Sequence, residues 1–88
     1  MRHVRRMVKE AFGTNLRKRR LNQKLTQENL AFESGLSLRY IQNLESGDRQ
    51  PTLETIFKLS FALNTSPQAL IQPTWKWWVA EARDKYNS

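Results

Sequence analysis

The chain has 88 residues, with 15 Lys or Arg against 8 Asp or Glu, one His and no Cys. This length provides one domain with a single core, and it is too short for an enzyme with a deep cleft. The absence of cysteine excludes disulfides, thiolate zinc sites and cysteine nucleophiles. No window approaches the roughly twenty apolar residues that cross a bilayer, and no secretory signal is visible, so we expect a cytoplasmic protein that contacts no membrane.

Positive charge is concentrated in the first part of the chain. Residues 1–24 hold nine Lys or Arg against Glu10 alone, a net +8, whereas residues 25–88 hold six against seven acids, a net −1. An excess of this kind favours a polyanionic partner such as nucleic acid. Because a basic segment also suits RNA or an acidic membrane surface, the charge alone does not identify the partner.

The first predicted element is a helix over residues 8–23. Its apolar side chains recur at helical spacing: Val8, Phe12 and Leu16. We interpret residues 1–11 as a basic N-terminal arm or an extension of this helix. The single histidine, His3, lies in that segment. A lone terminal histidine is typical of a solvated side chain, so we predict no metal site.

Two short helices joined by a tight turn follow. Thr26 is predicted to cap a helix over residues 27–33, because its hydroxyl can accept a hydrogen bond from a free backbone N–H. Gly35 ends that helix, since glycine reaches the left-handed backbone region without a Cβ penalty. Ser37 caps the second helix, which Gly47 ends. The outward side chains of this second helix include Leu38, Arg39, Gln42 and Asn43. A short helix of this kind, held against another, fits a DNA major groove.

Two more helices are predicted beyond Pro51. Thr52 is expected to cap the fourth helix, and Ser66 the fifth, with Pro67 at its first position, where proline is tolerated. The side chains expected to face the core are Leu53, Ile56, Phe57, Leu59, Leu63, Leu70 and Ile71.

The last segment holds all three tryptophans of the chain. Pro73 is expected to end the fifth helix, and Thr74 to cap a further helix over residues 75–86. Large apolar side chains on one stripe of this helix are the type enriched at the centre of interfaces. We therefore predict a dimer interface made by Trp75, Trp78, Val79 and Tyr86. The alternative is that the tail packs on the core of its own chain.

Seven segments between residues 12 and 70 resemble the lambda-repressor-like helix-turn-helix family, the class of phage repressor, Cro and XRE proteins. In chain order they are FG, LRKRR, LTQENLA, SGLS, YIQNLESG, RQPTLETIFKL and ALNTSPQAL. The resemblance implies an all-α fold, with a compact five-helix helix-turn-helix domain over residues 12–71. The extra C-terminal helix, over residues 74–86, is an addition to the family's minimal domain. The resemblance also implies binding to double-stranded operator DNA as a homodimer.

The resemblance places the base-reading residues on the second short helix: Leu38, Arg39, Gln42 and Asn43. Arg39 can donate two parallel hydrogen bonds to guanine O6 and N7, and its alternative role is a phosphate clamp. Leu38 departs from the polar residue often found in the family, and it could pack on a thymine methyl group instead.

The residues expected to contact phosphate are Lys18, Arg19, Gln27, Ser37, Tyr40, Arg49 and Gln50. We rank Lys18 and Arg19 above Arg17, because we expect the first two to approach the DNA-facing side. The resemblance also implies a structural ion pair between Arg20 and Glu45 that fixes the tilt of the recognition helix, and this makes Glu45 structural rather than catalytic.

The leading hypothesis for function is a sequence-specific transcriptional regulator that acts as a homodimer on a pseudo-palindromic operator. Small members of the family include phage repressors, antitoxins and controllers of restriction–modification genes, and we slightly prefer the last. The alternative is a protein-interaction module such as an antitoxin, with a protein partner for the Trp-rich tail. An enzyme is not expected, because the sequence has no Cys or His centre and no glycine-rich phosphate loop. We predict no catalytic residue and no cofactor.

Overall fold

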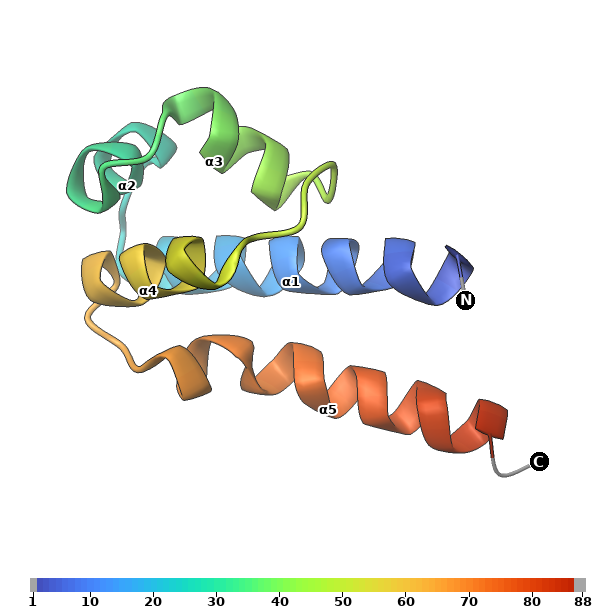
Figure 1. Cartoon of the computed structure of the whole chain (residues 1–88). Helices are drawn as coiled ribbons and strands as arrows, with labels where there is room; N and C mark the ends of the chain where they lie inside the picture. The colour runs from blue at the N-terminus through green and yellow to red at the C-terminus, as the bar shows by residue number, and fades with distance from the viewer. Residues whose placement is uncertain (1, 87–88) are drawn as a thin grey trace.

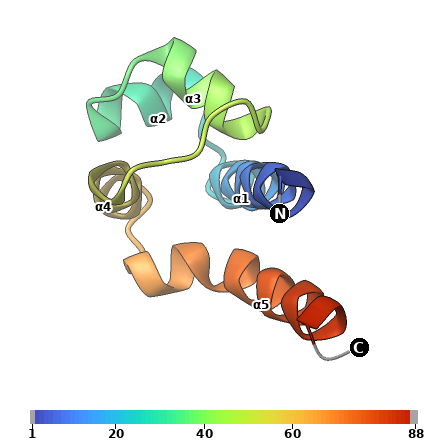
Figure 2. The ribbon, with the colours of Figure 1, turned by 45° about the vertical axis from the view of Figure 1, so that its right-hand side comes forward.

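The polypeptide folds into five α-helices arranged in three layers (Figure 1). The computed structural model describes the backbone of residues 2–86 and the side chains of residues 8–85. The helices are α1 (Arg2–Asn22), α2 (Gln27–Ser34), α3 (Leu38–Glu45), α4 (Leu53–Ala62) and α5 (Pro67–Tyr86). Helices α2 and α3 form one outer layer, α1 and α4 the middle layer, and α5 the opposite outer layer (Figure 2). The prediction of an all-α, five-helix fold is confirmed.

The core is shared by all five helices. Its buried apolar residues are Phe12, Leu16, Leu30, Ala31, Ile41, Leu44, Ile56, Leu59, Leu63 and Leu70. Each fully buried leucine or isoleucine contributes roughly 1.5–3 kcal/mol to folding. The single core therefore holds α3 on one side and α5 on the other.

The predicted caps of the two short helices are confirmed. Thr26 Oγ1 accepts a hydrogen bond from the Asn29 backbone N–H at 2.9 Å, and Ser37 caps α3 by accepting from the Tyr40 N–H at 3.1 Å. Gly35 follows α2 with φ 75°. Gly47, with φ 82°, lies two residues beyond the end of α3. These caps pair backbone groups that the helix ends leave without intrahelical partners.

Gly13 lies at a close approach between α1 and the end of α3. A Cβ atom at this position would stand 2.3 Å from the Leu44 carbonyl oxygen and 2.8 Å from that of Glu45. Glycine within a helix costs roughly 0.5–1 kcal/mol relative to alanine. Here the missing side chain allows the backbone of α3 to rest directly on α1.

The N-terminal segment continues the first helix. Because α1 begins at Arg2, residues 2–11 are helical, which is the second of the two alternatives that the sequence left open. The paths of α1 and α5 are antiparallel, and the start of α1 and the end of α5 lie at the same end of the molecule (Figure 1). The charged N-terminal turns thus extend past the α2–α3 layer.

The expectation that Pro73 ends the fifth helix is wrong, because α5 continues through it to Tyr86. Proline has no N–H, so it cannot donate to the Ala69 carbonyl four residues earlier. Arg19 supplies a replacement, since its Nη2 donates to that carbonyl oxygen at 3.1 Å. Thr74 is buried within the helix rather than at a cap, and its Oγ1 accepts from Asn15 Nδ2 at 3.4 Å. Residues 71–74 therefore do not separate two helices.

Three of the predicted core positions lie on the surface. Leu53 is 70% exposed, Phe57 51% and Ile71 41%. Apolar residues occur on two sides of α4, and the core covers only one of them. The buried side includes Thr55 and Ser60, whose hydroxyl groups are hydrogen-bonded. The core-facing side of α4 therefore includes two small polar residues that the sequence pattern had not placed in the core.

Candidate DNA-binding surface

The polar face of α3 lies on the outside of the molecule, on the side opposite α5 (Figures 1 and 2). Ile41 and Leu44 are fully buried and anchor the helix from below. The four predicted base-reading residues lie at the surface: Leu38, Arg39 and Gln42 are exposed, and Asn43 is half-buried. Base contact by these residues remains a prediction.

Arg39 is available to an external partner. It belongs to the first turn of α3, and no hydrogen bond or ion pair within the described part of the chain engages its guanidinium. Gln42 and Asn43 lie one turn further along the same helix. Side chains three and four residues apart share one helical face, so these three can approach neighbouring base pairs together.

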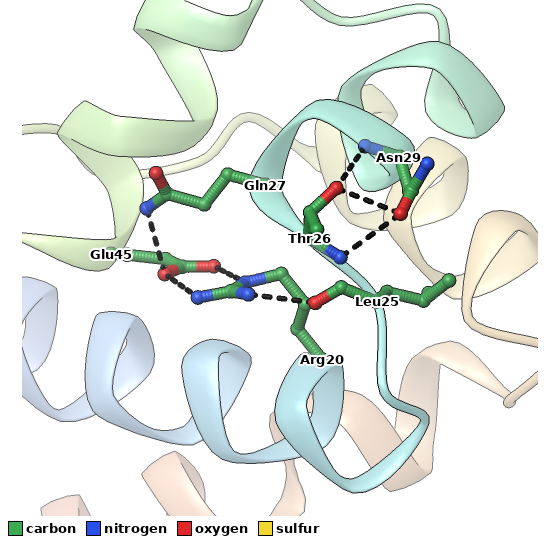
Figure 3. A network of polar contacts seen from close by, with 6 residues as sticks. All are labelled: Arg20, Leu25, Thr26, Gln27, Asn29 and Glu45. Atoms are coloured by element: carbon green, nitrogen blue, oxygen red, sulfur yellow. Dashed lines mark hydrogen bonds and ion pairs between the residues drawn. The ribbon is translucent and has the colours of Figure 1, made fainter.

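A buried ion pair joins α3 to α1 (Figure 3). Arg20 donates to both oxygens of Glu45, with Nε–Oε2 at 2.6 Å and Nη2–Oε1 at 2.9 Å. Its Nη1 donates to the Leu25 carbonyl oxygen at 2.8 Å. The side chains are only 8% and 4% exposed. The hydrogen bond to Glu45 raises the pKa of Arg20, although burial acts to lower it, so the guanidinium stays charged.

Gln27, the first residue of α2, joins the same network. Its Nε2 donates to Glu45 Oε1 at 3.1 Å (Figure 3). In front of it lies an open hollow that is also lined by Arg17, Arg20 and Lys24. The acidic Glu28 also lines this hollow. Helix N-termini carry partial positive charge and free N–H groups, which together with Arg17 and Lys24 favour an anion such as a phosphate.

The structure places the basic residues of α1 on different sides of the helix, and the expected phosphate contacts of Lys18 and Arg19 stay predictions. Arg19 points toward α5, where Nη1 donates to Thr65 Oγ1 at 3.2 Å and Nη2 to the Ala69 carbonyl. Lys18 borders a hollow that Pro73 of α5 also lines. Arg17 lies instead beside the start of α2. A helix turns about 100° per residue, so three consecutive basic side chains cannot share one face.

Tyr40 and Ser37 have partners inside the protein. The Tyr40 hydroxyl lies 3.1 Å from Thr55 Oγ1, a hydrogen bond that holds α3 against α4. The contact expected between Tyr40 and a DNA phosphate stays a prediction. Ser37 is exposed and uses its oxygen as the α3 cap.

The loop after α3 folds back on the end of the helix. The backbone N–H groups of Asp48 and Arg49 both donate to the Asn43 carbonyl, at 2.9 and 3.3 Å. Ser46 Oγ donates to Asp48 Oδ2 at 2.9 Å, which occupies one oxygen of the neighbouring acid. Arg49 and Gln50 are exposed in this ordered loop, and Gln50 also borders an apolar groove described below.

The predicted interface residues have different environments. Trp75 is exposed and stacks on Trp78, with ring centroids 5.8 Å apart. Trp78 and Val79 are half-buried, and the side chain of Tyr86 lies outside the described residues. Trp78 borders an apolar groove of about 270 Å³, lined by Val8, Phe12, Gln50, Pro51, Ile56, Ile71, Thr74, Trp75 and Trp78. Part of the tail therefore packs on α1 of its own chain.

Two sets of surface residues were not predicted from the sequence. Arg17 could have been found from its spacing, because it lies three residues before Arg20 and thus on the side of α1 that faces α3. The exposed side chains of α4, Leu53, Phe57 and Phe61, recur every four residues. This periodicity was visible in the sequence, but it is equally typical of a core-facing stripe.

Neither a membrane span nor a metal site is found in the part of the chain that the structure describes. No described helix is long and apolar enough to cross a bilayer. No cluster of three His, Cys, Asp or Glu that could hold a metal ion lies among the described residues.

The chain is similar to known helix-turn-helix proteins. Residues 16–70 match the family model described as helix-turn-helix. A transcriptional regulator of this type from Sinorhizobium fredii, y4dJ, is 37% identical over 67 residues, which cover 76% of this chain and 87% of that protein. Control protein C.BamHI of Bacillus amyloliquefaciens is 38% identical over 68 residues, 76% of this chain and 84% of that protein.

A solved structure of similar sequence has the same fold. The crystal structure of the restriction–modification controller protein C.AhdI from Aeromonas hydrophila superposes with a TM-score of 0.69 at 42% identity. The match covers 70% of this chain and 94% of that one.

Proposed function

Because the chain belongs to the helix-turn-helix family of DNA-binding transcriptional regulators, we propose that it is a restriction–modification controller. In this proposal it binds a pseudo-palindromic operator as a homodimer, with one α3 in each major groove. The main support is its 42% identity to the controller C.AhdI over nearly all of that protein. The relatives C.BamHI and C.AhdI are control proteins rather than enzymes, which agrees with a regulatory role.

The geometry of α3 supports sequence-specific binding. Arg39, Gln42 and Asn43 lie on one face, and the Arg20–Glu45 ion pair holds the helix that carries them. Phosphate contacts are proposed for Gln27, Ser37, Arg49 and Gln50, with Arg17 and Lys24 added from the hollow at the start of α2. Such contacts position the protein on the duplex, whereas base contacts select the sequence.

An exposed apolar face on α4 and α5 is proposed as the dimer interface. We call it the α4–α5 apolar face, and its residues are Leu53, Phe57, Phe61, Ile71 and Trp75. Phe61 is 87% exposed. Exposed apolar surface of this kind marks protein contacts, and two recognition helices about 34 Å apart need a fixed connection. The proposed interface keeps the predicted Trp75 with its stacked Trp78 and adds the side chains of α4.

Selection of DNA from a random library by the purified protein tests the operator proposal. We expect enrichment of a pseudo-palindrome whose half-sites lie about one helical turn apart. Arg39→Ala should weaken binding to that sequence by roughly 1–3 kcal/mol and relax selectivity at one base pair of each half-site. Equal losses on selected and random DNA would remove Arg39 from base reading. Failure to enrich any sequence would favour a protein-interaction module instead.

Sedimentation analysis tests the dimer proposal. Phe61→Glu places a charge in the α4–α5 apolar face and should shift the protein to the 10.4 kDa monomer. Phe32→Glu is the matched control, because Phe32 is similarly exposed but lies on α2. A Phe61→Glu protein that stays as dimeric as the Phe32→Glu control would place the interface elsewhere, with Val79 and Tyr86 as the next residues to test.

A further inference from the structure

A chain of three hydroxyl groups joins the recognition helix to α4. The Tyr40 hydroxyl of α3 lies 3.1 Å from Thr55 Oγ1, and Thr55 Oγ1 lies 2.9 Å from Thr52 Oγ1. As the cap of α4, Thr52 Oγ1 also accepts a hydrogen bond from the Thr55 N–H at 3.1 Å. Among residues 8–85, the contact between Tyr40 and Thr55 is the one hydrogen bond that joins α3 to α4. It therefore fixes the two helices relative to each other at a single point.

Thr55 has a core-facing position on α4. Its side chain is 5% exposed, on the same side of the helix as Ile56 and Leu59. An apolar residue fills such a position without a partner, whereas a buried hydroxyl group has to be hydrogen-bonded. Hydrogen bonds act within a narrow range of distance and angle, but apolar contacts have no direction. The Thr55 hydroxyl therefore restricts the orientation of α3 more than a methyl group would.

The opposite side of α4 carries part of the α4–α5 apolar face. A helix turns about 100° per residue, so Phe57 points nearly opposite to Thr55. Phe57 is 51% exposed. Helix α4 itself lies in the middle layer, between α2–α3 and α5 (Figure 2). In the proposed dimer, α4 thus contacts its own recognition helix through Thr55 and the second subunit through Phe57.

We propose that Thr55 and Tyr40 are positioning residues that set the distance between the two recognition helices of the dimer, and therefore the spacing of the half-sites that the protein accepts. The inference rests on the proposed homodimer and its α4–α5 apolar face. The two α3 helices would lie about 34 Å apart, and successive base pairs are about 3.4 Å apart. A dimer that rejects one extra base pair must therefore hold each α3 firmly relative to the interface. The hydrogen bond between Tyr40 and Thr55 supplies this restraint.

Thr55 can be changed without touching the proposed DNA contacts. In Thr55→Val a methyl group replaces the buried hydroxyl, and Thr52 keeps the hydrogen bond from the backbone N–H of residue 55. Tyr40 is half-buried, so its hydroxyl can turn to water and is not left without a partner. The variant should therefore fold and dimerise. The orientation of α3 relative to the interface is the property that changes.

The test measures dissociation constants on three DNAs at one salt concentration. They are the DNA selected above and two versions with one base pair inserted or deleted between the half-sites. We expect the wild-type protein to prefer the selected spacing, and Thr55→Val to lower that preference by about fivefold to tenfold. Sedimentation analysis compares the two proteins for dimer content. A variant that keeps the wild-type preference, or that loses the dimer, overturns the proposal.

Ser60→Ala is the matched control. Ser60 is also buried on α4, but its hydroxyl donates to the Ile56 carbonyl oxygen of the same helix at 2.7 Å. This variant removes a buried hydroxyl group that makes no contact with α3, and it should keep the wild-type preference for spacing. An equal fall in that preference for Ser60→Ala and Thr55→Val would assign the effect to packing of α4 rather than to its bond with α3, and would overturn the proposal.

Tyr40→Phe removes the other end of the hydrogen bond. Any phosphate contact of Tyr40 is lost on all three DNAs alike and cancels from the preference. Combined with Thr55→Val, this change should lower the preference no further than Thr55→Val alone, because both remove the same bond. Additive losses would contradict the proposal. A monomeric wild-type protein rejects the proposed homodimer itself, whereas a dimeric wild type that binds all three spacings alike rejects only this inference.

Discussion

The two sides of α1 hold the rest of the molecule by different means. Toward α3, Arg20 is buried in a bidentate ion pair with Glu45, and Gly13 allows backbone contact. Toward α5, the adjacent Arg19 bonds to neutral groups, the Thr65 hydroxyl and the Ala69 carbonyl. Both arginines make hydrogen bonds within the protein, although they stand in the same basic run of the sequence.

This difference has a consequence for stability and for DNA binding. On the α3 side the charges of Arg20 and Glu45 are buried away from water and neutralise each other. The loss of one therefore leaves the other as an isolated buried charge. On the α5 side Arg19 is partly solvated and replaces one helix hydrogen bond that Pro73 cannot make. We therefore expect large effects from changes on the α3 side, and modest effects on the α5 side.

The largest effect is expected from Glu45→Ala. It leaves Arg20 buried without its counter-ion and should lower the free energy of unfolding by about 3–5 kcal/mol. Urea denaturation followed by circular dichroism measures the change. Glu54→Ala is the control, because its exposed pair with Lys58 has N–O 3.6 Å apart and should change stability by less than about 0.5 kcal/mol. Similar changes in the free energy of unfolding for the two variants would contradict the large effect expected from the buried ion pair.

Gly13→Ala tests the backbone contact on the same side. Alanine is ordinarily the better helix former by roughly 0.5–1 kcal/mol. At this position its Cβ would collide with the Leu44 and Glu45 carbonyls, so we expect a net loss of about 1–3 kcal/mol. Thr14→Ala, at the adjacent exposed position, should be neutral or slightly stabilising. Thermal unfolding of both variants provides the comparison, and a stabilised Gly13→Ala protein would refute the close approach.

Arg19→Ala tests the α5 side. It removes the donors to Thr65 and to the Ala69 carbonyl, and it should lower the free energy of unfolding by about 1 kcal/mol. Affinity of the folded protein for DNA should hardly change. A strong loss of DNA affinity at unchanged stability would support the phosphate role first expected for Arg19.

Arg17→Ala should weaken DNA binding while changing the free energy of unfolding the least among these variants. Arg17 is exposed beside the start of α2, so its loss should flatten the log–log salt dependence of binding by about 0.9 for each subunit. Lys18→Ala is the matched comparison, because Lys18 lies nearer α5. An equal slope change in both variants would mean that DNA contacts both residues.

Much of the fold could be predicted because the signals were local. Thr26 and Ser37 cap helices through residues three positions ahead, and Gly35 uses a backbone angle that other residues avoid. Hydrophobic spacing likewise located Phe12, Ile41 and Leu44 in the core. Each of these inferences depends on a few neighbouring residues, and therefore survives without knowledge of the tertiary fold.

The predictions that were wrong depend on contacts between segments that are distant in the sequence. Pro73 was expected to end a helix because its local effect is to remove a hydrogen bond, and only Arg19, 54 positions away in the chain, supplies the replacement. The place of Phe57 depended on which side of α4 the other helices cover. The direction of a side chain on α1 could be predicted from helical periodicity, but the residue that this side chain contacts could not.

The sequence by itself determined the class of fold, the caps of the two short helices and the residues that α3 carries on its outer face. Local backbone preferences and helical periodicity are sufficient for these features. The tertiary structure decided that Arg17 rather than Arg19 lies beside α2, that α5 passes through Pro73, and that Phe57 remains uncovered. These outcomes depend on how helices distant in the chain share one core, because that packing decides which side of each helix stays in water.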